Sequence, residues 1–130
     1  MHLFSKYCRL GVFLLTTGSV AVAETNAIDF ISPKQASVMY TENKAVIVDV
    51  REDNEWNEQH IHGAIHIPLA QLKQRLSELE PYRNSPIIAQ CRSGKRSEQA
   101  QQTLKSAGFS KVYNMEGGIQ AWDNEGLATE

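Results

Sequence analysis

PIIAQCRSGKRS, residues 86–97, contains a short apolar run, a cysteine and a loop rich in small and basic residues. The run Pro86–Ala89 is typical of a buried parallel strand, because it is short, apolar and bounded by proline. We expect a helix to follow, with Ser97 as its N-cap and Gly108 as its C-terminal stop. Cys91 is therefore predicted to lie where a strand ends and a loop turns toward a helix N-terminus.

The loop that follows the cysteine is predicted to bind anions. Such a turn aims several backbone N–H groups inward and adds the positive end of a helix dipole. Arg92, Lys95 and Arg96 bring three cations to the same few residues. Because this environment stabilises a thiolate, we expect the pKa of Cys91 to be lowered. The same donors would hold a dianion beside the sulfur.

The 130 residues allow one domain, and we expect residues 1–23 to be a secretory signal peptide outside it. Two basic residues precede a mostly apolar run, Leu10–Ala23, which ends in small residues. The run is shorter than the roughly 20 residues that a membrane span needs, although an uncleaved anchor is the alternative. Cleavage before Glu24 would leave a mature domain, residues 24–130, exported to the periplasm and free of the membrane.

Cysteine content and charge narrow the classes of function. Cys8 lies within the expected signal peptide, so cleavage leaves Cys91 as the only thiol. An exported protein with one cysteine forms no internal disulfide, which makes that thiol a candidate for reactivity. The chain has a formal net charge of −2, and cleavage removes basic residues only. A nucleic-acid partner is not expected, because proteins that bind nucleic acid are usually basic.

Strands and helices alternate along the rest of the chain. The expected strands are Ile28–Ile31, Ala45–Val50, Ile65–Ile67, Pro86–Ala89 and Lys111–Met115. This alternation predicts an α/β fold, an open parallel five-stranded sheet with helices on both faces. Ligands bind such sheets outside the carboxyl ends of the strands. Asp49–Arg51, the segment after Cys91 and Asn114–Gly118 should therefore face one cleft.

Two of the helices between these strands carry specific signals. Ser32, Pro33 and Gln35 form the pattern of a capping box with proline at the first helical position. Four leucines at helical spacing predict one amphipathic α-helix over Leu69–Glu80. These two segments should each pack one face against the sheet.

Histidines and one charged pair also need an interpretation. His60, His62 and His66 could suggest a metal site, but no second cluster of ligands is evident in the sequence. We therefore expect structural roles for these histidines. Asp49 and Arg51 are expected to form a buried pair that braces the loops, because buried charges are usually paired.

Three separated segments resemble the motifs of the rhodanese family. The first extends from Val48 to Pro68, the second is the loop Cys91–Ser97, and the third is Val112–Trp122. Their order and spacing follow the family across nearly the whole mature chain. A small exported single-domain form is similar to the phage-shock-type periplasmic rhodaneses. Gln59 departs from the pattern, because the family usually has glycine before the histidine.

This resemblance implies a rhodanese-like fold and thiosulfate sulfurtransferase activity through a persulfide on Cys91. The thiolate would take the outer sulfur of thiosulfate, and cyanide or a thiol acceptor would then remove it. The implied partners are a small-molecule sulfur donor and acceptor, with a protein thiol as an alternative acceptor. No metal and no organic cofactor is expected. Cys91 is the expected catalytic residue, and the expected substrate-binding residues are Arg92, Ser93, Gly94, Lys95, Arg96 and Ser97.

Two other functions stay open at this point. Rhodanese-like folds also occur as non-catalytic or sulfur-carrying modules that act on a protein partner, and fold alone does not establish catalysis. Cysteine phosphatases and arsenate reductases use a similar anion loop. The phosphatase pattern needs an arginine six positions after the cysteine, where this chain has Ser97, and typically a histidine in place of Gln90.

Overall fold

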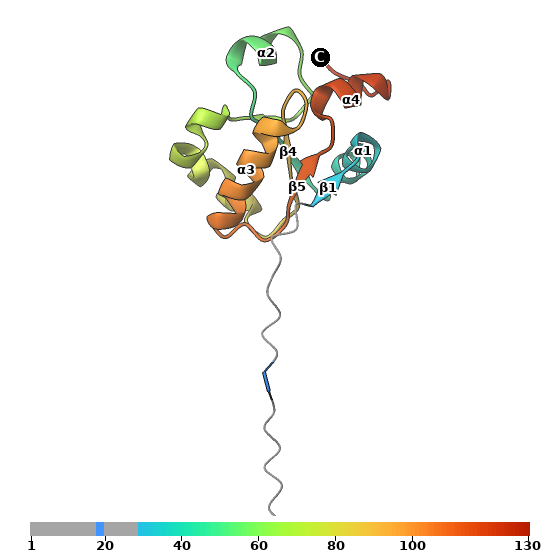
Figure 1. Ribbon diagram of the computed structural model, residues 1–130. Coiled ribbons are helices and arrows are strands. Elements are labelled where there is room, and N and C mark those ends of the chain that lie inside the picture. Colours follow the sequence, from blue (N-terminus) through green and yellow to red (C-terminus); the bar gives the residue numbers. More distant parts are fainter. Residues whose placement is uncertain (1–17, 20–28) are drawn as a thin grey trace, which may run out of the picture.

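The computed structural model describes residues 18–19 and 29–130. The expected signal peptide lies almost entirely outside the described residues. Within them, no helix combines the length and the apolar character that crossing a membrane requires. Figure 1 shows the described part as one domain in which helices surround a twisted sheet.

The described part of the chain forms one sheet of five parallel strands in the order β1–β5–β4–β2–β3. The strands are β1 (Phe30–Ile31), β2 (Val46–Asp49), β3 (Ile65–His66), β4 (Ile87–Gln90) and β5 (Val112–Met115). The strand that precedes Cys91, β4, is central and pairs with β2 on one side and β5 on the other. The predicted open parallel five-stranded sheet is confirmed.

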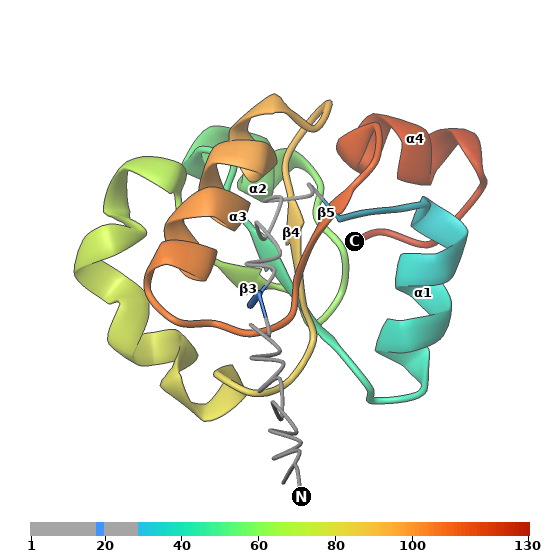
Figure 2. The ribbon, with the colours of Figure 1, turned by 60° about the horizontal axis from the view of Figure 1, so that its bottom comes forward.

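Helices cover both faces of this sheet, as Figure 2 shows. One face packs against α1 (Pro33–Thr41) and α4 (Gly118–Asn124), and the other against α3 (Lys95–Ser106) and the 3-10 helices η1 (Leu69–Gln71) and η2 (Lys73–Tyr82). A sixth helix, α2 (Asp53–Glu58), lies at the carboxyl end of the strands beside the loop before α3 (Figure 1).

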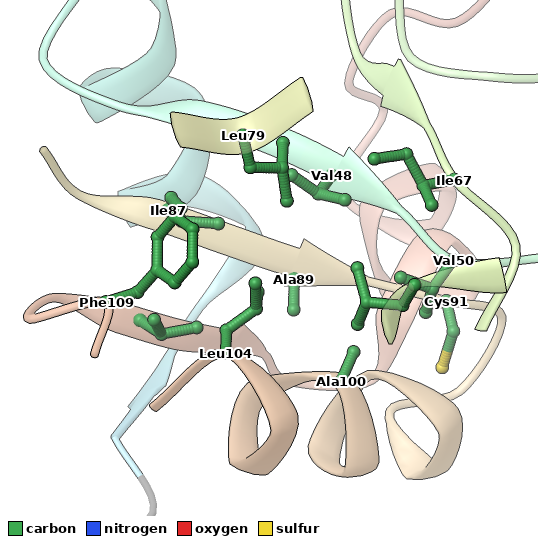
Figure 3. Packing of buried hydrophobic residues seen from close by; sticks show 12 residues of the cluster. Val48, Val50, Ile67, Leu79, Ile87, Ala89, Cys91, Ala100, Leu104 and Phe109 are labelled. Carbon is green, nitrogen blue, oxygen red and sulfur yellow. The ribbon is translucent and has the colours of Figure 1, made fainter. Parts of the chain in front are cut away.

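The alternation of side chains along each strand builds two separate cores. In β4, Ile87 and Ala89 point to the α3 side, whereas Ile88 points to the α1 and α4 side. Figure 3 shows the first of these cores, with Cys91 at one end of its row of buried side chains. Apolar residues on both faces explain why β2 and β4 read as continuous apolar runs.

The start of α1 follows the predicted signal. The backbone N–H of Ser32 donates to Gln35 Oε1 at 2.9 Å, and the N–H of Gln35 donates to Ser32 Oγ at 3.1 Å. Pro33 occupies the first helical position, where its missing N–H is not needed. The predicted capping box is confirmed.

The predicted α-helix over Leu69–Glu80 is wrong in type. This segment forms η1 and η2, with non-helical backbone at Arg75 (φ −113°, ψ 16°). In a 3-10 helix residues i and i+3 share a face, which suits the two leucine pairs Leu69–Leu72 and Leu76–Leu79. Leu72 and Leu76 are four residues apart instead of three, and the non-helical backbone at Arg75 between them accommodates this difference. All four leucines therefore still pack against the core.

Candidate active site

Cys91 is the first residue after β4, at the carboxyl end of the central strand. Its side chain has 0% of its surface exposed and packs beside Val50 and Ala100. The backbone just before it is held to the segment after β2, because Val50 N–H donates to Gln90 O at 2.9 Å. The predicted position of the cysteine, where a strand ends and a loop begins, is confirmed.

The loop that follows directs hydrogen-bond donors at the sulfur. The N–H of Gly94 lies 3.1 Å from Cys91 Sγ, and the hydroxyl oxygen of Ser97 lies 3.3 Å from it. Burial raises the pKa of the Cys91 thiol, but hydrogen bonds from Ser97, Gly94 and Ser93 outweigh this effect. The pKa of Cys91 is therefore lowered, in the direction that the sequence predicts.

The N-terminal end of α4 explains how the loop keeps its N–H groups turned inward. The N–H of Ile119 donates to Cys91 O at 2.9 Å, and that of Gln120 donates to Arg92 O at 3.2 Å. In a trans peptide the N–H points away from the C=O. With the Arg92 carbonyl held by α4, the Ser93 N–H of the same peptide faces the sulfur. The inward orientation therefore depends on a helix that begins 27 positions after the cysteine.

Gly118 permits this close contact. It has φ +59°, and a Cβ at this position would lie 2.5 Å from the carbonyl oxygens of both Cys91 and Arg92. A side chain here would collide with backbone, which cannot rotate away as a flexible side chain can. Only glycine lets α4 approach the loop this closely.

The predicted N-cap role of Ser97 is wrong. The N-cap of α3 is Gly94, with φ 110°, and the helix begins at Lys95. Ser97 therefore lies within the first turn, where its buried hydroxyl donates to Asn114 Oδ1 at 2.6 Å and contacts the sulfur. A positive φ at Gly94 starts the helix without a side-chain cap, because glycine adopts that conformation without strain. Gly108, with φ 92°, follows the C-cap as predicted.

The three cations of the loop have different surroundings. Arg92 and Lys95 are exposed, and neither forms a side-chain hydrogen bond or ion pair with another described residue. Arg96 instead binds Glu55 of α2 through two hydrogen bonds of 2.6 and 2.9 Å. The hydrogen bonds from Arg96 lower the pKa of Glu55 to about 2. The pair is therefore ionised at any physiological pH and ties the loop to α2.

A second, buried pair fixes α2 itself. Arg51 donates to the Asp49 carboxylate at 2.8 Å, and the same guanidinium donates to the backbone carbonyls of Glu55 and Gln59. The predicted buried Asp49–Arg51 pair is confirmed, and it satisfies carbonyls at the C-terminal end of α2. Sequence reasoning missed Glu55. The spacing of four residues between Arg51 and Glu55 could have indicated that Glu55 lies near the site. The partner of Glu55 could not be found in this way, because Arg96 lies 41 residues away in the sequence.

The histidines have structural contacts. The rings of His60 and His66 stack on Trp56, with centroid distances of 3.8 and 4.6 Å. His60 and His62 also contact the carboxylate of Glu130. Over the described ranges, no three His, Cys, Asp or Glu side chains gather in a way that could hold a metal ion.

Comparison with known proteins agrees with this geometry. A model of the rhodanese-like domain family matches residues 32–125. The chain is 30% identical over 92 residues to the thiosulfate sulfurtransferase GlpE of Coxiella burnetii, covering 71% of this chain and 84% of that protein. It is 45% identical over 76 residues to the "Putative sulfur carrier protein YrkF" of Bacillus subtilis, covering 58% of this chain and 40% of the relative.

A solved structure of similar fold is the thiosulfate sulfurtransferase of Pseudomonas aeruginosa, with a TM-score of 0.71 and 26% identity. The match covers 80% of this chain and 19% of that one. The chain spans only 40% to 61% of the length of three curated relatives that it matches.

Replacing Ser97 with alanine should raise the pKa of Cys91, because the thiolate loses a side-chain donor. Ser93→Ala is the matched control, since Ser93 acts through its backbone N–H, which alanine keeps. The measurement is the ultraviolet absorbance of the thiolate as a function of pH, in a Cys8→Ser background. Equal midpoints in the two variants would contradict the role of the Ser97 hydroxyl.

Gly118→Ala should displace the loop from α4 and raise the pKa of Cys91. Gly126→Ala is a control with a similar φ of +71° and nothing within 4 Å of its Cβ. Both variants should lose about 1–2 kcal/mol of stability, because alanine is strained in left-handed backbone. Any further loss of stability in Gly118→Ala therefore measures the collision with the loop. Chemical denaturation and the thiolate titration together measure both effects. If the two variants behave alike, the contact with α4 does not orient the loop.

Glu55 and Arg96 should behave as one unit in a double-mutant cycle. We expect a coupling free energy of unfolding of about 1 kcal/mol between Glu55→Gln and Arg96→Gln, because the pair is partly buried and doubly hydrogen-bonded. The exposed pair Arg75–Glu78 has similar distances and serves as the control. The coupling free energy of the Arg75–Glu78 pair should be clearly smaller. If the coupling free energy of Glu55–Arg96 is no larger than that of the control pair, this would argue against a tie between the loop and α2.

Proposed function

Because the chain belongs to the rhodanese-like domain family, we propose that it is a sulfurtransferase that carries a sulfane sulfur atom on Cys91. The observation that supports this most is the lowered pKa of a single buried cysteine whose sulfur accepts loop hydrogen bonds. Such donors stabilise negative charge on the sulfur before the reaction. They also suit a persulfide, whose outer sulfur carries the charge after it.

In the first half-reaction we propose thiosulfate as the donor. The Cys91 thiolate attacks the outer sulfur of thiosulfate, a new S–S bond forms, and the S–S bond of thiosulfate breaks. The electron pair of that bond leaves with sulfite, so the enzyme keeps one sulfur as a negatively charged persulfide. Because the side chain of Cys91 has no exposed surface, the loop has to move for the donor to reach it.

In the second half-reaction an acceptor removes the outer sulfur. Cyanide attacks that atom, the Cys91 S–S bond breaks, and its electron pair returns to the Cys91 sulfur as a thiolate. The product is thiocyanate, and a thiol acceptor would give a new persulfide in the same way. Splitting the transfer into two displacements lets each partner react separately with the same sulfur.

The loop residues take distinct parts in this proposal. Arg92 and Lys95, which are exposed and unpaired within the described residues, attract the dianionic donor and offset charge on departing sulfite. Arg96 acts mainly through Glu55, as a brace for the loop. Ser97 and the N–H groups of Ser93 and Gly94 hold the sulfur.

A sulfur carrier that serves a protein partner is the second candidate. It is favoured by one relative whose name describes a sulfur carrier, at 45% identity. Such a protein would form the same persulfide but pass it to a protein thiol rather than to a small acceptor. The chemistry on Cys91 is common to both candidates, and only the acceptor differs.

Treatment with thiosulfate should add the mass of one sulfur atom to the full chain, and cyanide should remove it. Cys91→Ser should show no gain, whereas Cys8→Ser should gain the sulfur as the parent chain does. Intact mass spectrometry measures the parent chain after thiosulfate and again after cyanide, and each of the two variants after thiosulfate. A chain with Cys91 that gains no sulfur from thiosulfate, or a gain that persists in Cys91→Ser, would contradict the proposal.

A further inference from the structure

A cleft with a volume of about 240 Å³ borders the Cys91 loop. One wall comes from α2 and the residues after it, the other from α4, and Arg92 lies at the loop side. Figure 1 shows these three parts at the same end of the molecule. The residue next to the reacting cysteine therefore also lines a cavity large enough for a small molecule.

Two charged residues of the cleft are neutralised within the protein. Arg51 is paired with Asp49 and also donates to backbone carbonyls of the α2 segment. Glu55 is paired with Arg96 through two hydrogen bonds. These residues shape the cleft, but they offer little net charge to a molecule inside it.

Three charges of the cleft are left uncompensated among the described residues. Arg92 at the loop and Glu58 on the α2 wall have no ionic partner there. Asp123 on the α4 wall accepts a hydrogen bond of 2.7 Å from Gln59, a neutral donor that leaves the charge in place. The cleft thus presents one cation, on the residue that follows the reacting cysteine, and two carboxylates on its walls.

We propose, on the basis of the function proposed above, that this cleft binds the sulfur acceptor and selects a small amino-acid thiol. The carboxylate of the thiol binds Arg92, and its ammonium group binds between Glu58 and Asp123. Opposite charges on one molecule match the cation and the carboxylates of the cleft, whereas a purely anionic thiol meets repulsion from both walls. Glu58 and Asp123 are therefore residues that determine acceptor specificity.

The transfer itself balances without a further reagent. The acceptor thiol gives its proton to the outer sulfur of the anionic Cys91 persulfide, and the thiolate that results attacks this sulfur and forms a new S–S bond. The S–S bond to Cys91 breaks, its electron pair returns to the Cys91 sulfur, and the proton stays with the persulfide of the acceptor.

The test follows the second half-reaction alone, in a Cys8→Ser background. The persulfide is formed with thiosulfate, the excess is removed, and the loss of sulfur is timed with L-cysteine, cysteamine or 3-mercaptopropionate. Glu58→Gln and Asp123→Asn should each slow cysteine and cysteamine by about twofold to fivefold, the range of an exposed ion pair. Neither should slow 3-mercaptopropionate. Asparagine at 123 keeps the oxygen that Gln59 binds, so the walls stay in place.

Glu42→Gln is the matched control, because it removes one charge just before β2, at the opposite end of the strands. It should change none of the three rates. Each acceptor is compared with itself across proteins, so differences in thiol reactivity cancel. Equal slowing of all three acceptors, or no change in any, overturns the proposed specificity. Failure of the parent chain to form a persulfide, or to lose it to cyanide, overturns the underlying function instead and the specificity with it.

Discussion

The conformation of the Cys91 loop depends on hydrogen bonds that do not involve the sulfur. The N-terminal end of α4 binds the carbonyls of Cys91 and Arg92, and Gly118 lets the two backbones meet. Once the Arg92 carbonyl points toward α4, the Ser93 N–H of the same peptide points toward the sulfur. The stabilisation of the thiolate therefore comes from the Ser97 hydroxyl together with backbone N–H groups of a loop that the backbone of α4 holds in place.

The hydroxyl of Ser97 links this anion site to the rest of the protein. It has one proton and two neighbours, because it donates to Asn114 Oδ1 at 2.6 Å and lies 3.3 Å from Cys91 Sγ. A neutral thiol leaves that proton with Asn114, whereas a thiolate attracts it. Asn114 also donates to Gly94 O, so the same amide holds the residue that begins α3. One side chain of β5 thus contacts both the hydroxyl beside the sulfur and the residue that caps α3.

Two ion pairs, one acting through the other, hold the surroundings of the loop in place. The buried Asp49–Arg51 pair fixes α2 to the sheet, and Glu55 of α2 then holds Arg96 of the loop. This chain of contacts gives Arg96 a bracing role and leaves Arg92 and Lys95 as the cations open to solvent. The division suits the proposed sulfur transfer, in which the donor is anionic and the acceptor enters beside Arg92.

The sequence alone determined the strand–helix alternation, the parallel sheet, the capping box at Ser32 and the place of Cys91 where a strand ends. These features follow from local patterns of apolar residues, caps and glycines. Only the tertiary structure decided that Gly94 rather than Ser97 caps α3, that Arg96 pairs with Glu55, and that α4 turns the loop inward. Each of these contacts joins residues by geometry rather than by a local pattern. A sequence shows which groups are present, but the partners of a hydrogen bond between distant segments are set only when those segments pack together.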